Sequence, residues 1–266
     1  MASLQTELTL LYAAGLIYSL FGGMSLFPSL RQRYHHLLVS LVVLALAVHS
    51  TSIAVRWQRV DHGPFINLYE ILTSNLWSNM LGIALFFIFL RRRTDITWFV
   101  MPIMLVMMLW LFVSPTRDTF LPPTYNTVWL YFHVVSGKFF FTLLLLSTGL
   151  ACHALLLQYR GASSEDMQPY TVLAYKFLAL AFVFESFMLF FGAIWAQDAW
   201  GRYWSWDPLE TWAFATWLCV VFTLHMQVNA KKGTAFLWLV PACLVIAFLT
   251  FYGVPFISTA PHKGMI

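Results

Sequence analysis

Residues 200–212 read Trp-Gly-Arg-Tyr-Trp-Ser-Trp-Asp-Pro-Leu-Glu-Thr-Trp and stand between two long apolar runs. Their indole rings offer broad, flat apolar surface, while Arg202, Asp207 and Glu210 add charge that a hydrocarbon interior would disfavour. The stretch therefore predicts a functional site between two membrane helices, and not a simple connection. Such a mixture suits a planar amphipathic ligand, but Trp and Tyr also gather at membrane interfaces where no ligand binds.

The composition extends this interpretation to the whole chain. Of its 266 residues, 60% are hydrophobic and only 10% are charged, which is typical of a polytopic membrane protein. A helix of about 20 apolar residues crosses the hydrocarbon layer. We therefore expect an all-α polytopic membrane protein with a single membrane domain over residues 1–266. The eight runs that predict its transmembrane helices lie near 7–28, 37–55, 66–90, 96–113, 129–158, 170–195, 211–229 and 235–253.

The basic residues predict the orientation in the membrane. Eight lie in the connections after the first, third, fifth and seventh runs: Arg31, Arg33, Arg91, Arg92, Arg93, Arg160, Lys231 and Lys232. Five lie in the opposite connections and the C-terminal tail: Arg56, Arg59, Arg117, Arg202 and Lys263. Because cytoplasmic connections carry the excess of Lys and Arg, we expect the N- and C-termini and the Trp-rich connection to be extracytoplasmic. The clusters act as topology signals, so the net charge of +4 indicates no nucleic-acid binding.

The three cysteines form no recognisable motif. Cys152, Cys219 and Cys243 lie inside apolar runs and belong to no CxxC or CxxCH, so neither a disulfide framework nor covalent heme attachment to this chain is expected. Their expected role is packing. The first apolar run follows no basic segment and has no small-residue cleavage site, which favours a retained helix over a removable signal peptide.

The order of residues in 200–212 resembles the tryptophan-rich WWD signature of the heme-handling membrane proteins of cytochrome c maturation. The residues that carry the resemblance are Trp200-Gly201, Tyr203-Trp204, Trp206-Asp207-Pro208, Glu210-Thr211-Trp212 and Thr216-Trp217. The continuation Pro-Leu-Glu-Thr-Trp after Asp207 resembles the CcsA/ResC branch and differs from the related CcmC and CcmF proteins. The resemblance implies a CcsA-like core over about 37–266 and an extracytoplasmic WWD loop over 196–212.

A second segment carries the same resemblance. Residues 64–70 read Pro-Phe-Ile-Asn-Leu-Tyr-Glu and are similar to the P-x-x-N-x-Y-E segment of that family. The Gly-Pro pair before it favours a turn, and the polar residues after it favour a helix start. Considered by itself, Glu70 is typical of an interfacial carboxylate, because the ends of membrane helices tolerate charge better than their centres.

The resemblance implies protoheme (heme b) as both substrate and ligand. The outer heme iron would lie between His133 and His262, and alignment on Tyr252-Gly253-Val254 puts His262 at the family's second histidine position. Two neutral imidazoles can bind iron from opposite faces. A lone histidine one turn inside a membrane helix is otherwise typical of a residue at the membrane interface.

The Trp-rich connection would supply the rest of the heme site. On the family's pattern, Trp200, Trp204 and Trp206 would cover the macrocycle. The guanidinium of Arg202 would pair with a propionate, since its geometry suits carboxylates. We expect Asp207 to orient the loop by capping the helix that begins at Pro208, and not to donate protons.

His225 would be a ligand of a second heme. It lies roughly 20 Å along its apolar run, where an ionisable residue is a functional-site hypothesis. The position resembles the family's transmembrane heme-ligand histidine, and a hydrogen bond to a neighbouring helix is the alternative. His49 and His153 lie at other depths, so the second ligand is expected from another chain. Lys138 and Glu185 lie about 14 and 15 Å below the outer ends of the fifth and sixth runs, and we expect them to form an ion pair. A proton path or a contact of Lys138 with a heme propionate is the alternative.

The resemblance also implies a function and partners. The chain would move heme to the outer membrane face and present it for thioether attachment to the CxxCH of apocytochrome c, as a heme lyase within a complex. Expected partners are a CcsB/ResB-like membrane protein, apocytochrome c, thiol reductant proteins and the lipid bilayer of a bacterial inner or plasma membrane or a thylakoid. The alternatives are a transmembrane heme b electron-transfer subunit and a heme exporter or chaperone without synthase activity.

Overall fold

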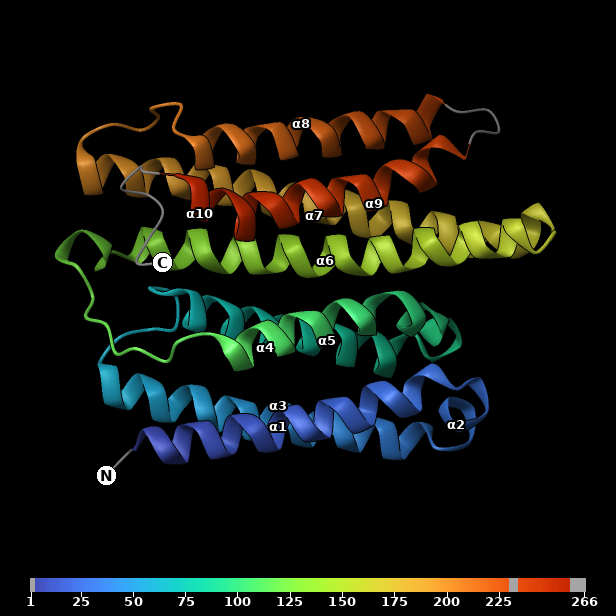
Figure 1. The fold of residues 1–266 in the computed structure, drawn as a ribbon. Helices are drawn as coiled ribbons and strands as arrows, with labels where there is room; N and C mark the ends of the chain where they lie inside the picture. Colours follow the sequence, from blue (N-terminus) through green and yellow to red (C-terminus); the bar gives the residue numbers. More distant parts are fainter. Residues whose placement is uncertain (1–2, 230–233, 259–266) are drawn as a thin grey trace. The chain divides into compact units, whose positions relative to one another are not determined.

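The computed structural model describes residues 3–229 and 234–258, and all regular structure in these ranges is helical (Figure 1). Eight helical segments are long and apolar enough to cross a membrane, as the sequence predicts. The long helices are α1 (Leu4–Leu26), α3 (His35–Val60), α4 (Leu68–Phe89), α5 (Thr97–Val113), α6 (Val128–Tyr159), α7 (Ser164–Trp200), α8 (Pro208–Asn229) and α9 (Ala235–Phe248). The short ones are α2 (Pro28–Arg33), η1 (Arg91–Ile96), η2 (Pro123–Tyr125), η3 (Leu249–Gly253) and α10 (Val254–Ile257).

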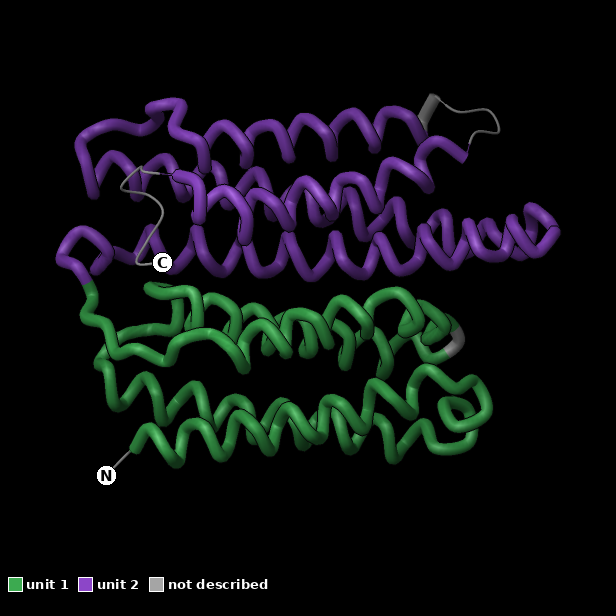
Figure 2. Tube along the Cα trace, viewed as in Figure 1, with its two compact units in different colours: residues 1–121 green, residues 122–266 purple. Residues whose placement is uncertain are grey.

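The chain forms two compact units, residues 1–121 and 122–266, which Figure 2 shows in different colours. The first contains α1 to α5 and the second contains α6 to α10. Each unit is described by itself below. The expected single membrane domain over 1–266 therefore stays a prediction.

Close helix packing holds the first unit together. Gly15 on α1 faces α5, where an added Cβ would lie 2.4 Å from the Phe112 ring, so a larger residue would require that ring to move. Phe21 of α1 packs edge-on against Phe87 of α4, with ring centroids 5.2 Å apart. These contacts bury the apolar faces that α1 directs away from lipid.

The second unit is built on a long hairpin of α6 and α7. Ser163 and Asp166 form a capping box that begins α7, because each side chain accepts from the other's backbone N–H. Ser147 of α6 donates to the Ala174 carbonyl of α7 at 2.8 Å. The hairpin positions two residues of the candidate site: His133 near the start of α6 and Trp200 at the end of α7.

Candidate functional site

The Trp-rich connection is shorter than the WWD stretch, because only residues 201–207 lie between α7 and α8. Gly201 ends α7 with φ 76°, a left-handed conformation that glycine adopts without strain, and its N–H donates to the Gln197 carbonyl. Trp206 also has a positive φ, 58°, which is unfavourable for a bulky residue. Such strain persists only where the surroundings impose it, and it directs the Trp206 indole outward.

Two carboxylates impose the shape of this loop. Asp207 accepts from the backbone N–H of Glu210 at 2.9 Å and so caps α8 at Pro208, as the sequence predicts. The Glu210 side chain is buried and accepts from the backbone N–H groups of Ser205 at 2.7 Å and Asp207 at 3.4 Å. Sequence reasoning assigned no role to Glu210, although an Asp followed three residues later by Glu is a capping-box pattern.

The indole rings of the connection pack on one another and on α8. Trp204 and Trp206 lie edge to face with centroids 5.6 Å apart, and both contact Phe214 at 6.4 and 6.0 Å. The Trp206 ring is 65% exposed. The buried Nε1–H of Trp204 has no hydrogen-bond partner among the described residues. A buried donor without an acceptor is costly, so it marks a place where an acceptor from outside would be stabilised.

A second aromatic cluster connects Trp200 to His133. The Trp200 ring packs edge-on against Trp195, with centroids 5.1 Å apart, and Trp195 stacks on the His133 imidazole at 5.9 Å. Trp195 is buried and donates from Nε1 to the Thr124 carbonyl at 3.1 Å. Tyr125 packs against Trp195, and burial raises the pKa of the Tyr125 hydroxyl, which keeps it protonated. No motif in the sequence marked Trp195 or Tyr125.

His133 is held in one orientation by α7. Its Nδ1 lies 2.8 Å from the carbonyl of Met188, which can only accept, so Nδ1 carries the proton and Nε2 the lone pair. A Cβ added at Gly192 would lie 2.7 Å from Nδ1, so the ring fills the space that this glycine leaves. A backbone hydrogen bond of this kind is what fixes the tautomer of a metal-ligating histidine.

The structure brings only part of the expected heme site together. Trp200 reaches His133 through Trp195, whereas Trp204 and Trp206 form their own cluster with Phe214. Arg202 is exposed and forms no ion pair within the described part of the chain. His262 lies outside the described residues, so its pairing with His133 stays a prediction.

The histidines inside the membrane differ in their surroundings. His225 is exposed on α8, and its Nδ1 donates to the Val221 carbonyl of the same helix at 2.9 Å, so the structure shows no bond to a neighbouring helix. His49 is fully buried, with Nε2 2.8 Å from the Thr73 hydroxyl and Nδ1 3.4 Å from the Tyr18 hydroxyl. His49 is therefore a hydrogen-bonded core residue, whereas His225 presents its imidazole outward.

The expected ion pair between Lys138 and Glu185 is not formed as a hydrogen-bonded pair. Both carboxylate oxygens of Glu185 are buried without a hydrogen-bond partner among the described residues. Helical rise gave the two residues one depth, but depth does not say which face of a helix a side chain occupies. Glu185 interacts electrostatically with Cys243 of α9.

The second family-like segment lies in a buried charge network of the first unit. The Asn67 side chain caps α4 by accepting from the Glu70 N–H at 2.9 Å. Arg56 donates twice to Glu70, at 2.9 and 2.8 Å, and once to Glu7 at 3.2 Å. Tyr69 also donates to Glu7, at 2.9 Å. Glu70 is 0% exposed, so it is a buried member of this network, and its place at the membrane interface stays a prediction.

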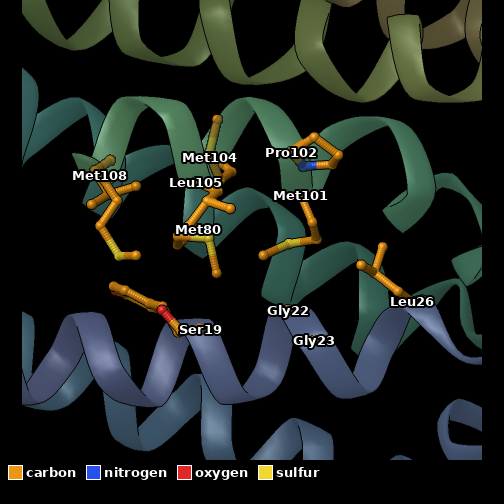
Figure 3. A pocket seen from close by; sticks show the side chains of 12 residues that line it. Ser19, Gly22, Gly23, Leu26, Met80, Met101, Pro102, Met104, Leu105 and Met108 are labelled. Atoms are coloured by element: carbon orange, nitrogen blue, oxygen red, sulfur yellow. The ribbon is translucent and has the colours of Figure 1, made fainter. Parts of the chain in front are cut away.

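The first unit also contains an apolar cavity of about 260 Å³ between α1, α4 and α5. Figure 3 shows methionine side chains from α4 and α5 beside it, among them Met80, Met101 and Met108, opposite Gly22 and Gly23 of α1. No charged residue lines it. The cavity therefore offers no partner for the propionates of a heme.

Comparisons with known proteins place these features in a family. The family model described as "Cytochrome C assembly protein" matches residues 65–262. The cytochrome c biogenesis protein CcsA of Prochlorococcus marinus (strain MIT 9312) is 27% identical over 259 residues, covering 84% of this chain and 82% of that protein. CcsA of Chlamydomonas reinhardtii is 30% identical over 196 residues, covering 67% of this chain but 53% of its own length.

A solved structure shares the fold. The cytochrome c heme lyase CcmF superposes with a TM-score of 0.67 at 17% identity, over 97% of this chain and 47% of that one. At this identity the likeness concerns the fold alone. The family model, however, spans most of the chain, including Glu70, His133 and the Trp-rich connection. This multi-pass membrane protein belongs to the cytochrome c assembly protein family and is a homologue of the CcsA proteins of cytochrome c biogenesis.

Proposed function

We propose that the chain binds protoheme as its substrate at the extracytoplasmic membrane face and presents it for attachment to apocytochrome c. The observation that carries this proposal is the fixed imidazole of His133. Its Nδ1–H bond to Met188, the space at Gly192 and the stacked Trp195 ring hold a neutral ring in one orientation. A neutral imidazole so held is a ligand for iron, and His262 would bind the opposite face.

The Trp-rich connection supplies groups that match the rest of a heme. The unpartnered Trp204 Nε1–H and the exposed Arg202 guanidinium would donate to the propionates. Trp200, Trp204 and Trp206 would cover the macrocycle, and the exposed Trp206 ring is the one that a bound porphyrin would screen from water. Asp207 and Glu210 set the loop and do not touch the substrate in this scheme.

The chemistry needs little from the protein beyond binding and orientation. Each thiol of a CxxCH segment adds its S–H across one vinyl group, so a C–S bond and a C–H bond form and no leaving group departs. The histidine of that segment would replace one of the two imidazoles on the iron. Holding vinyl and thiol side by side converts a slow bimolecular step into an effectively intramolecular one.

The route through the membrane involves His225. Its imidazole is exposed on α8, so a ligand for the other face of a transmembrane heme would come from outside this helix bundle. A CcsB/ResB-like membrane protein is the partner that we propose for this role. If the eight candidate spans all cross the membrane, both chain ends and the Trp-rich connection would lie on one side, and the distribution of basic residues supports the proposal that this side is extracytoplasmic.

Absorption spectra of purified protein test the ligand assignment. His133→Gly should lose the reduced low-spin bands of the outer heme, and added imidazole should restore them, because free imidazole fits the space that the ring leaves. His49→Gln is the matched control, since its ring is fully hydrogen-bonded inside the first unit. An unchanged spectrum in His133→Gly would overturn the assignment.

Reconstitution tests the activity. The protein, with and without its partner, is given heme, a reductant and a CxxCH peptide, and thioether formation is followed by the mass of the peptide. Attachment that is lost in His133→Gly and restored by imidazole would support the lyase. Heme transport without attachment in the complete complex would instead show an exporter or chaperone.

A further inference from the structure

Two of the three cysteines lie in contact within the second unit. The Sγ atoms of Cys219 on α8 and Cys243 on α9 are 3.5 Å apart, and the Thr223 hydroxyl lies 3.2 Å from the Cys243 sulfur. A disulfide bond requires about 2.05 Å, so the sulfurs need to approach by only about 1.5 Å.

A buried carboxyl group stands beside this pair. Glu185 of α7 is 0% exposed, and neither of its oxygens has a hydrogen-bond partner among the described residues. An electrostatic interaction couples it to Cys243. A carboxylate without donors in an apolar interior gains stability by accepting a proton. Because a thiol must lose its proton before its sulfur can attack, Glu185 is a proton acceptor at the place where one is needed.

The depth of the pair limits what can oxidise it. Cys219 lies about 17 Å along α8 from Pro208, and Cys243 about 12 Å along α9 from Ala235, at 1.5 Å per residue. The active-site thiols of a folded, water-soluble oxidoreductase do not reach such a depth. Cys219 is partly exposed on the outer surface of the helices, where a molecule dissolved in the bilayer can approach it.

We propose that Cys219 and Cys243 form a redox-active dithiol that a lipid-dissolved quinone oxidises to a disulfide between α8 and α9. Two S–H bonds break and one S–S bond forms. The two electrons and two protons convert the quinone to its quinol, so the reaction balances. The ionised form of Glu185 accepts the Cys243 proton as the thiolate forms and passes it on, and the local negative charge moves from the carboxylate to sulfur without increasing.

The oxidation would act on the helix that bears His225, one of the proposed heme ligands. The α8 helix begins at the Trp-rich connection and carries His225, and the disulfide would tie it covalently to α9. The proposal does not depend on heme binding, and it can be tested on protein that contains no heme. Its failure would leave the proposed heme function unaffected, and the reverse also holds.

Counting free thiols in membrane vesicles tests the proposal. Vesicles are treated with decylubiquinone, denatured, and labelled with a maleimide polymer that adds one gel shift for each free thiol. In wild type the number of free thiols should fall from three to one, because Cys152 lies outside the pair. In Cys152→Ser it should fall from two to none. Cys219→Ser and Cys243→Ser should each keep both remaining thiols. Peptide mapping should find the linked Cys219 and Cys243 peptides, lighter by two hydrogen atoms.

The reaction rate tests the part played by Glu185. Glu185→Gln should slow the loss of thiols about a hundredfold, the lower range for a general base, and leave the final thiol count unchanged. Glu165→Gln, at an exposed position in the first turn of the same helix, is the control. Persistence of both thiols in quinone-treated Cys152→Ser would overturn the proposal, and so would linkage through Cys152. An unchanged rate in Glu185→Gln would remove Glu185 from it.

Discussion

Replacing Arg56 by Met tests whether charge pairing holds the first unit together. Arg56 is 2% exposed and is the only Lys or Arg side chain within ion-pair distance of Glu70 in the described residues. Glu7, in contrast, keeps a second partner, since Arg59 donates to it at 2.7 Å. The substitution therefore leaves one buried carboxylate, that of Glu70, without a compensating charge. The backbone N–H of Ile66 still donates to it at 2.9 Å, which offsets only part of the loss.

The expected cost is about 3–5 kcal/mol, the range for breaking a buried ion pair by removing one partner. Adding Glu70→Gln to Arg56→Met removes the uncompensated charge and should recover about 2 kcal/mol, which gives a non-additive double-mutant cycle. Unfolding in mixed detergent micelles, followed by circular dichroism, measures the free energies. Arg33→Met is the control, because Arg33 is exposed at the end of α2, and it should cost about 0.5 kcal/mol or less.

Either of two results would refute this reasoning. The first is a loss in Arg56→Met no larger than the loss in Arg33→Met, which would mean that the network contributes no more than an exposed arginine. The second is an additive cycle, in which Glu70→Gln destabilises the Arg56→Met background as much as it destabilises wild type. In that case, the aliphatic packing of Arg56, and not its charge, would account for the loss.

Three further substitutions test the second unit. Gly192→Ala should lower heme affinity about tenfold, because the added methyl group would lie 2.7 Å from His133 Nδ1. Gly23→Ala is the control: its methyl group would meet nothing within 4 Å, so the heme titration should stay unchanged. Glu210→Gln should destabilise the connection by about 1–2 kcal/mol, seen as faster proteolysis between α7 and α8. Trp204→Phe should leave stability within about 0.5 kcal/mol, because no hydrogen bond is lost, yet weaken heme binding. Equal losses of stability and heme binding in Trp204→Phe would contradict the proposed role of its N–H.

The spans were predictable because their cause is local. Apolar runs of sufficient length determine that a segment crosses the membrane, and all eight were read from the sequence. Their ends were less predictable. Helix α7 was expected over 170–195 but extends over Ser164–Trp200, because a capping box begins it in polar sequence and Gly201 ends it beyond the apolar run. Hydropathy detects the hydrocarbon-spanning part of a helix, whereas caps determine its full length.

The site was predictable only where its determinants are close in sequence. The cap that Asp207 forms on α8 follows from its place before Pro208, and the role of Glu210 follows from the same spacing. The environment of His133, in contrast, depends on Met188 and Trp195, which lie on another helix and carry no motif. Gly192 acts there by the volume that it leaves empty, a property that no sequence pattern displays.

The surroundings of Glu185 show what an argument from depth omits. Helical rise matched its depth to that of Lys138, and the cost of an unpaired charge made a pair the natural expectation. Two side chains at the same depth contact each other only if both helices also direct them toward each other. Both carboxylate oxygens of Glu185 are buried without a hydrogen-bond partner among the described residues, so a matching depth did not give this carboxylate a hydrogen bond from Lys138.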